Sequence, residues 1–242
     1  SVVALTGAGI SVPSGIPDFR SPGTGLWRNV DPMEVAHIDA FHQDPQRFWS
    51  FYGQRFQSLE GKQPNPAHRA LAALEEAGHL DAVITQNVDC LHSKAGSRQV
   101  VEVHGSIRSS SCLDCGAGHP LAEVRRRLAA DEHGVPRCDC GQPLKPDVVL
   151  FGEYLPVDAL ERAQGLAAAA DLMLCVGSSL EVYPVAALPE RILSRGGRLA
   201  IVTQSGTPFD GMASVRLSGD VVDELRAVAA ALGRIEAALR AR

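Results

Sequence analysis

The sequence has no excess of positive charge. It contains 23 Lys and Arg residues against 28 Asp and Glu residues, for a formal net charge of −5. Strong binding to nucleic acid or to an anionic membrane requires a basic patch, and the basic residues here are spread along the chain. No apolar run reaches the length of a membrane-spanning helix, and no signal-peptide pattern precedes the apolar run from Val2 to Leu5. We therefore expect neither a nucleic acid nor a membrane as a partner.

Cysteine is scarce and unevenly placed. Six are present, and four of them form two close pairs, at positions 112 and 115 and at positions 138 and 140. Close pairs in a chain without a secretory signal favour a metal site over disulfides, because the cytoplasm keeps thiols reduced. We therefore expect a cytoplasmic protein. The other two, Cys90 and Cys175, stand alone in apolar or helical surroundings, where we expect simple burial.

The two pairs have the spacing of a structural zinc site. Four thiolates would lie within reach of one tetrahedral ion and leave no position for water, so we expect one zinc per chain that takes no part in chemistry. The predicted ligands are Cys112, Cys115, Cys138 and Cys140. The second pair is one residue shorter than the usual C-x2-C, so His119 or His133 remains open as a substitute ligand.

Short β-branched runs alternate with helical stretches along most of the chain. This alternation favours an α/β fold with a doubly wound, Rossmann-like parallel sheet. We expect strands at 2–6, 82–85, 172–176 and 198–203, a helix at 67–77, and a closing helical region at 220–240 with an interruption at Gly233.

Two stretches break this alternation. Residues 28–62 are rich in aromatic side chains at helical spacing, and residues 109–143 hold both cysteine pairs. We interpret them as a helical insertion and a zinc-ribbon insertion that together form a smaller domain. The Rossmann-like domain would then consist of residues 1–27, 63–108 and 144–242.

A glycine-rich turn, Gly7-Ala8-Gly9, follows the first predicted strand. Such a turn lets backbone N–H groups approach a pyrophosphate, although glycine also ends strands for simple steric reasons, and the sequence leaves both interpretations open. The third glycine of the dehydrogenase fingerprint would fall at position 12, which is Val12. Its absence argues against a hydride-transferring Rossmann enzyme.

Polar residues follow two other predicted strands. Gln86, Asn87 and Asp89 come after the strand at 82–85, and His104 comes after a β-like run and before a glycine. The carboxyl ends of parallel strands face the crevice in which such sheets bind ligands. A lone histidine is usually structural, but the polar strand ends make His104 a candidate catalytic residue. In the loop around Phe19, Asp18 and Arg20 fit either a buried salt bridge or a ligand contact.

These segments, in this order, resemble the motifs of the sirtuin family. The motifs are GAGIS from Gly7, GIPDFR from Gly15, TQNVD from Thr85, HG at His104, KPDVVLFGE from Lys145 and GSSLEVYP from Gly177. The likeness extends from Val3 to Leu225. It implies an NAD-dependent protein-lysine deacylase, with NAD as co-substrate and acyl-lysine proteins as partners.

The resemblance also implies roles for particular residues. The glycine turn, with Ser178 and Ser179, would hold the NAD phosphates, and Gln86 would contact the nicotinamide ribose. The residues implied on the nicotinamide side are Asp18, Phe19, Arg20, Trp27, Asn87 and Asp89. Further implied NAD-binding residues are Gly7, Ala8, Gly9, Ser11, Gly177, Thr203, Gln204 and Val221.

For the reaction, the resemblance implies that the acyl oxygen attacks C1′ of the nicotinamide ribose and nicotinamide departs. His104 would take a proton from the ribose hydroxyls, with Asn87 as a second catalytic residue, and water would finally release lysine and O-acetyl-ADP-ribose. The implied acyl tunnel is lined by Phe19, Val149 and Phe151. The substrate backbone would pair near Gly152, Glu153, Glu181 and Val182.

Two departures from the family pattern bear on NAD affinity and acyl preference. Thr203 stands where many sirtuins carry Asn, so NAD affinity is expected to be lower than typical. Tyr52 and Arg55 have the Y-x-x-R spacing of sirtuins that remove succinyl and malonyl groups, but Tyr52 also fits an aromatic core stripe with a solvated Arg55. We expect deacetylation, with acidic acyl groups as a second activity.

Two other functions remain open. Protein mono-ADP-ribosyl transfer needs the same NAD cleavage and no new residue. A zinc-ribbon binding module without catalysis is the non-enzymatic alternative, which the intact His104 and TQNVD motif oppose.

Overall fold

The computed structural model describes the backbone of residues 1–18 and 31–240. Six parallel strands form the main sheet in the order β3-β2-β1-β7-β8-β9, which is the doubly wound order expected from the sequence. The strands are β1 (Val2–Thr6), β2 (Ala82–Thr85), β3 (Val100–Glu102), β7 (Leu172–Val176), β8 (Arg198–Val202) and β9 (Val215–Leu217). The chain reverses its direction of winding between β1 and β7, so ligands are expected at the carboxyl ends of these two strands.

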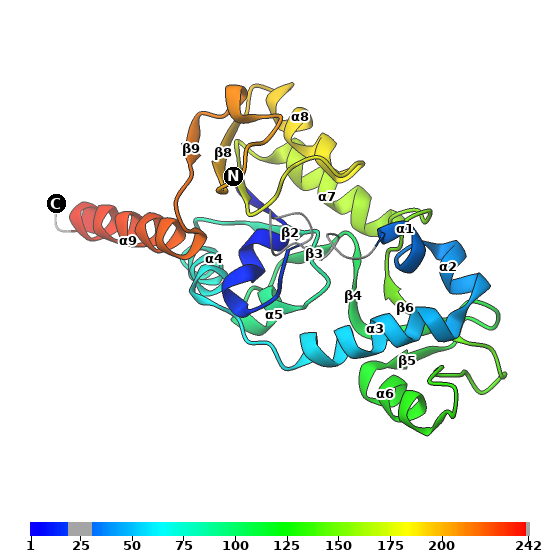
Figure 1. The fold of residues 1–242 in the computed structure, drawn as a ribbon. Coiled ribbons are helices and arrows are strands. Elements are labelled where there is room, and N and C mark those ends of the chain that lie inside the picture. The colour runs from blue at the N-terminus through cyan, green and yellow to red at the C-terminus, as the bar shows by residue number, and fades with distance from the viewer. Residues whose placement is uncertain (19–30, 241–242) are drawn as a thin grey trace.

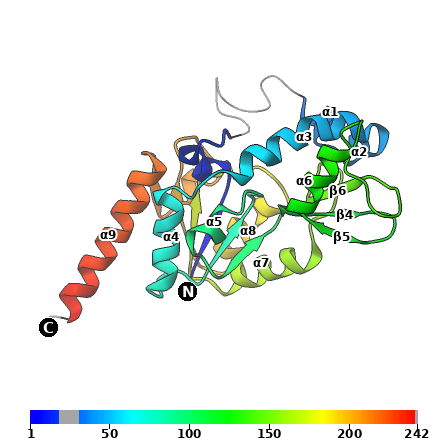
Figure 2. The same ribbon diagram turned by 90° about the horizontal axis from the view of Figure 1, so that it is seen from below.

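Helices cover both faces of this sheet. On one face α4 (Pro66–Glu76) packs against α9 (Val221–Arg240), and on the other α7 (Val157–Ala169) packs against α8 (Leu188–Leu193), as Figures 1 and 2 show. Each pair buries its own cluster of aliphatic side chains against the strands. The helix α4 begins where the sequence predicts, because Asn65 caps its N-terminus and Pro66 occupies its first turn. This part also contains the short α5 (Leu91–Ala95) and, among the residues that the structure describes, the 3-10 helices η1 (Ala8–Ser14), η3 (Val185–Ala187) and η4 (Asp210–Met212).

The closing helix differs from its prediction. It runs without a break from Val221 to Arg240, so the expected interruption at Gly233 is wrong. An internal glycine costs a helix only about 1 kcal/mol relative to alanine, and the neighbouring Ala and Leu residues are strong helix formers. Gly233 is exposed, and no atom lies within 4 Å of the place where its Cβ would be, so no packing conflict forces a bend.

A second part of the molecule lies beside the sheet, on the right in Figure 1. It contains a three-stranded antiparallel sheet, β5-β4-β6, built from β4 (Gly105–Cys112), β5 (Gly118–Pro120) and β6 (Leu144–Val148). Its helices are α1 (Pro32–Val35), α2 (Ile38–Gln43), α3 (Pro45–Glu60) and α6 (Leu121–Ala130). Residues of both predicted insertions share one hydrophobic cluster there.

The aromatic stripe of α3 packs against β6, the strand that directly follows the second insertion. Phe48 and Trp49 are almost fully buried, and the Trp49 indole donates a hydrogen bond to the Leu144 carbonyl of β6 at 2.9 Å. Glu60, at the end of the same helix, forms an ion pair with Arg125 of α6. The insertions are therefore packed as one unit, although the exact domain boundaries stay a prediction.

Strands β4 and β6 join two functional regions. β4 starts one residue after His104 and ends at Cys112, and its register pairs Gly105 with Val148 and Cys112 with Leu144. The backbone N–H of Val149 extends this pairing by donating to the His104 carbonyl at 2.8 Å. One antiparallel ladder thus has the histidine at one end and a cysteine at the other.

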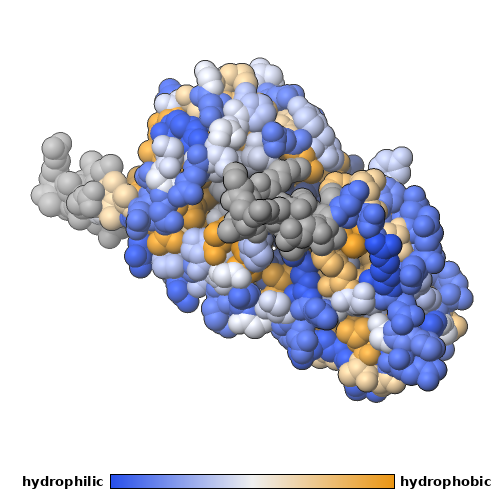
Figure 3. Space-filling model, viewed as in Figure 1, coloured by the Kyte–Doolittle hydropathy of each residue, from blue (hydrophilic) through white to orange (hydrophobic). Residues whose placement is uncertain are grey.

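The surface is mixed in polarity. Figure 3 shows a largely hydrophilic face on which hydrophobic residues form separate patches rather than a continuous band. Among the described residues, no helix combines the length and the hydropathy needed to cross a membrane.

Candidate functional site

Two glycine turns interlock at the carboxyl ends of β1 and β7. Gly7 N–H donates to the Val176 carbonyl at 3.0 Å, and Gly9 N–H donates to the Gly177 carbonyl at 2.8 Å. Gly177 has φ +59, and a Cβ there would lie 2.3 Å from the Ile10 nitrogen. Side chains larger than hydrogen therefore cannot fit where the two turns cross, and steric need alone accounts for these glycines.

A cavity of about 540 Å³ opens above these turns, between the main sheet and the second part of the molecule. Many predicted site residues meet in its wall. They are Gly7, Ala8, Gly9, Asp18, Tyr52, Arg55, Gln86, Asn87, His104, Val149, Phe151, Gly152, Glu153, Gly177, Ser178, Ser179, Glu181, Val182 and Thr203. The sequence therefore identifies residues from eight separate segments that the fold brings together.

Other predicted residues do not line this cavity. Ser11 and Asp89 lie buried behind its wall, where the Ser11 hydroxyl donates to the Asp89 carboxylate at 2.7 Å. The other Asp89 oxygen accepts from Leu91 N–H at 2.9 Å, at the start of α5. Gln204 and Val221 lie outside the lining, and Phe19, Arg20 and Trp27 fall outside the described residues.

Hydrogen bonds fix the polar strand end after β2. The Asn87 amide donates to the Gly7 carbonyl and to the Ser11 hydroxyl, each at 3.1 Å. The Gln86 amide donates to the Ser178 hydroxyl at 2.9 Å. Since both amides are held by the glycine-turn segments, the β2 end, the β1 turn and the β7 turn form one rigid floor.

The imidazole of His104 is oriented by the same strand end. Its Nδ1 lies 3.0 Å from the Gln86 carbonyl oxygen, which can only accept, so Nδ1 carries the proton. Nε2 is then the nitrogen left to accept a proton. Burial lowers the pKa of His104, against the opposing effect of the Gln86 hydrogen bond. The ring is therefore neutral and basic at neutral pH, the state a general base requires.

Two further histidines, His68 and His92, form a buried pair beneath the floor of the cavity. The rings of His68 and His92 lie 4.9 Å apart, and His92 Nε2 is 2.9 Å from the Thr6 hydroxyl. Burial lowers the pKa of His68 to about 4 and that of His92 to about 3. Both rings are therefore neutral in the folded protein.

This pair predicts acid destabilisation. Because the folded pKa values lie below the usual value near 6.5, the unfolded chain binds more protons, and stability is complete above about pH 6.5 and falls as the pH drops towards 4. Each histidine should contribute a slope of about 1.4 kcal/mol per pH unit. Urea unfolding of wild type and His92→Asn at several pH values between 5 and 6.5 measures this. The variant should show a shallower slope, and equal slopes would contradict the prediction.

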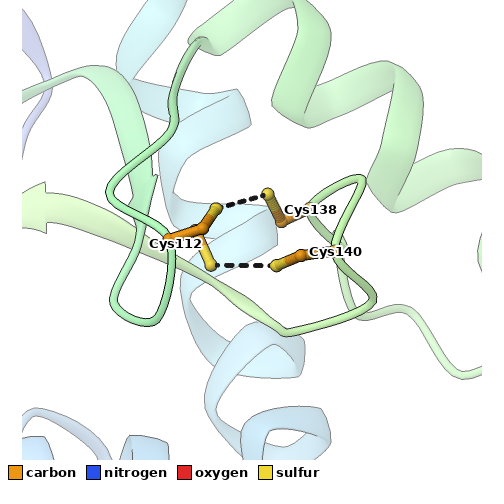
Figure 4. A group of neighbouring side chains, drawn as sticks. Cys112, Cys138 and Cys140 are labelled. Carbon is orange, nitrogen blue, oxygen red and sulfur yellow. Dashed lines mark hydrogen bonds between the residues drawn. The ribbon is translucent and has the colours of Figure 1, made fainter.

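The four predicted zinc ligands form one cluster. The Sγ atoms of Cys112, Cys115, Cys138 and Cys140 all lie within 4.8 Å of one another. Cys112 faces Cys140 at 3.4 Å and Cys115 faces Cys138 at 3.5 Å, two pairs that Figure 4 draws across the gap between two loops. About 2.3 Å from zinc to each sulfur suits such a group, so the chemistry of the donors and their spacing fit one tetrahedral zinc.

Neither histidine considered as a substitute belongs to this cluster. His119 Nε2 lies 3.6 Å from the Cys138 sulfur, so it contacts a ligand from outside. His133 pairs with Glu132.

At the other end of the cavity, apolar and charged side chains meet. Tyr52 stacks on Phe48 with ring centroids 4.5 Å apart, as the aromatic-stripe interpretation predicts. Arg55, however, is half-buried and lines the cavity beside Tyr52 rather than lying fully in solvent. Burial raises the pKa of Tyr52 to about 12.

Sequence reasoning missed several residues of the lining. They are Ala36, Phe51, Phe56, Val88, Val148, Leu150, Leu155, Tyr183, Ser205 and Gly206. Most are apolar residues of ordinary helices, strands or turns. Two signals were available. Val88, Val148, Leu150 and Tyr183 lie within the sirtuin-like motifs, and Ser205 and Gly206 lie in the loop that follows β8, near a carboxyl strand end.

Comparisons with known proteins agree with this geometry. The profile of the Sir2 family matches residues 7–184. An NAD-dependent protein deacetylase of Sulfolobus acidocaldarius is 49% identical over 215 residues, covering 89% of this chain and 83% of that protein. This chain belongs to the Sir2 family. The resemblance to sirtuins is thereby confirmed.

Other members of the Sir2 family show the same relation. An NAD-dependent protein deacetylase of Thermotoga maritima is 44% identical over 227 residues, covering 93% of this chain and 91% of that protein. A solved Sir2 complex with a p53 peptide and NAD+ has a TM-score of 0.88 at 44% identity, and covers 96% of this chain and 93% of that one. The shared fold therefore extends over nearly the whole chain.

Proposed function

We propose that this Sir2-family protein is an NAD-dependent protein-lysine deacetylase that produces nicotinamide, free lysine and O-acetyl-ADP-ribose. One observation carries the proposal: a single cavity is lined by the interlocked glycine turns, the Gln86-Asn87 strand end, the oriented His104 and the segment from Val149 to Glu153. Dinucleotide-binding backbone, a general base and an apolar channel are the three parts that such a transfer needs.

Each part has a task. The glycine turns line the part of the cavity expected to hold the phosphates, and the amides of Gln86 and Asn87 shape the ribose and nicotinamide end. NAD supplies a ribose carbon that accepts the acyl oxygen and releases nicotinamide. His104, neutral through burial, then removes a ribose hydroxyl proton at Nε2.

The acyl-lysine side of the cavity is held by a partly buried ion pair. Lys145 Nζ lies 2.9 Å from the Glu153 carboxylate and donates to the carbonyls of Pro146 and Val148, each at 3.0 Å. The same Glu153 oxygen accepts from Leu150 N–H at 2.8 Å. This pairing fixes the loop that carries Phe151 and Gly152, against which a substrate backbone would lie, opposite Glu181 and Val182.

The four-cysteine cluster would hold zinc as a structural ion. The cluster lies at the far end of the β4–β6 ladder from His104, so the zinc would stabilise the second part of the molecule and contribute no group to the reaction. All six cysteines lie in the described part of the chain and none of them forms a disulfide, which fits a reducing compartment, and we propose the cytoplasm as the location.

The experiment that tests the function is an incubation of the protein with NAD and a panel of acyl-lysine peptides, with products identified by mass spectrometry. Deacetylated peptide and O-acetyl-ADP-ribose in equal amounts are expected. Nicotinamide release that needs no acyl-lysine, with ADP-ribose added to protein, would favour mono-ADP-ribosyl transfer instead.

A second candidate activity, removal of succinyl or malonyl groups, is favoured by the half-buried Arg55 in the lining. An acyl carboxylate could accept two hydrogen bonds from its guanidinium. We expect acetyl-lysine to remain the better substrate, because aromatic and aliphatic side chains form most of this end of the cavity.

Replacing Arg55 with methionine tests this activity. If Arg55 clamps the carboxylate, Arg55→Met should lower kcat/KM for a succinyl peptide by about 10- to 100-fold, the effect of losing a charged hydrogen bond, and should lower that for the acetyl peptide much less. Arg47→Met, an exposed arginine on the same helix, is the control. A strong succinyl preference in wild type that vanishes in the Arg55 variant would overturn the expected acetyl preference.

A further inference from the structure

The loop after β8 forms one wall of the cavity. Thr203, Ser205 and Gly206 all line it, at the carboxyl end of a strand in the second half of the doubly wound sheet. Residues outside the cavity lining keep this wall in its shape.

The guanidinium of Arg216 donates hydrogen bonds to backbone carbonyls of this loop. Its Nη1 donates to the Thr203 carbonyl, and its Nη2 donates to the Ser205 carbonyl at 2.7 Å. Nη1 also donates to the Leu217 carbonyl at 2.9 Å. Arg216 belongs to β9, whose register pairs it with Ile201 of β8, so its side chain reaches over the end of β8 from the edge of the sheet.

Three carbonyl oxygens that converge on one point repel one another unless a donor group separates them. A planar guanidinium can do so because its N–H groups diverge in a fixed fork, whereas a lysine ammonium presents its donors from a single atom. Without the guanidinium of Arg216, the carbonyls of Thr203 and Ser205 would turn towards water. The loop would then leave the position in which its other side forms the cavity wall.

A carboxylate holds the guanidinium in turn. Asp210 Oδ1 accepts from Arg216 Nε at 3.1 Å and from the Thr207 hydroxyl at 2.7 Å. Phe209, next to Asp210, is 3% exposed in the main core. The loop is thus tied at its start by Arg216 and at its end by the Thr207–Asp210 turn, with the guanidinium joining the two.

We propose that Arg216 is a positioning residue for the adenosine end of the NAD site, acting through the carbonyls of Thr203 and Ser205. The inference rests on the proposed use of NAD. It assigns to Arg216 a role that the side chain of Thr203 does not supply, namely fixing the loop before the dinucleotide arrives. A preformed wall removes the cost of ordering the loop on binding.

Binding of ADP-ribose and NAD to the intact protein, measured by isothermal titration calorimetry, tests this role. Arg216→Met should raise both Kd values about tenfold or more. The Kd values of Arg216→Lys should lie between those of wild type and Arg216→Met, because lysine keeps the positive charge but loses the diverging N–H groups of the guanidinium. In turnover, KM for NAD should rise while KM for the acetyl peptide stays within about twofold. Arg198→Met, an exposed arginine at the opposite end of β8, should bind as wild type does.

The possible outcomes distinguish a failure of the proposed NAD-dependent function from a failure of the role proposed for Arg216. If wild type binds neither ADP-ribose nor NAD, the proposed function fails and this inference fails with it. If wild type binds and Arg216→Met binds equally well, or if both KM values rise together, only the role of Arg216 is overturned. Arg216→Lys decides the question should the Met variant not fold, since wild-type affinity in a folded Lys variant contradicts the need for the fork.

Discussion

His104→Ala is expected to lower the rate of deacetylation by about 100- to 10,000-fold, the usual loss when a positioned general base is removed. The fold and most of the NAD affinity should remain, because the His104 side chain is bonded to the Gln86 carbonyl and is not among the core side chains, while its backbone bond to Val149 survives the substitution. Single-turnover rates with an acetyl peptide, together with calorimetric binding of NAD, measure the two effects separately.

The pH dependence gives an independent check on this base. Because burial lowers the pKa of His104 in the free protein, the acid limb of kcat/KM in wild type should lie below about pH 6.5. His42→Ala, at an exposed histidine, is the control and should keep both rate and profile. A well-folded His104→Ala protein with near-normal turnover would contradict the assignment.

Removing one zinc ligand should have the largest effect on stability. Cys112→Ala is expected to lose the metal and to lower the Tm by about 10 °C or more, since structural zinc contributes folding free energy directly and each kcal/mol shifts a domain of this size by about 2–4 °C. Metal analysis by mass spectrometry and thermal unfolding measure the two quantities on one sample.

Cys175→Ala supplies the matched control. Cys175 is buried in β7, away from the cluster, so this variant removes a thiol of the same kind without a zinc ligand. It should retain one zinc per chain and most of the stability. A Cys112→Ala protein that is free of zinc yet as stable and active as wild type would refute the structural role.

Local sequence signals were sufficient where one short segment contains the cause. The paired cysteines, four strands of the main sheet and the helix at 67–77 follow from spacing and residue type, and the structure has each of them, with strand and helix ends within one residue. The strand-end position makes His104 a candidate, because the carboxyl ends of parallel strands face the crevice, while its role as general base comes from the sirtuin resemblance.

The sequence could not predict the roles of residues that depend on a contact with a distant part of the chain. Helical spacing puts Tyr52 and Arg55 on one face of α3, but it cannot say that this face meets a cavity. Arg216 lies in a strand of only three residues and acts on carbonyls more than ten positions earlier, and a single sequence carries no sign of that. Asp89 looks like a crevice residue, yet its bond to Leu91 N–H makes it part of the start of α5.

The hydrogen bond from Trp49 to Leu144 also has a consequence for synthesis on the ribosome. The two residues are 95 positions apart, and at about 5–20 residues per second the aromatic stripe of α3 leaves the ribosome about 5–20 s before its partner strand exists. During that interval Phe48 and Trp49 have no β6 to cover them. The nascent chain therefore presents an apolar helix that chaperones can bind, and expression at low temperature, which lengthens the interval, should increase its dependence on them.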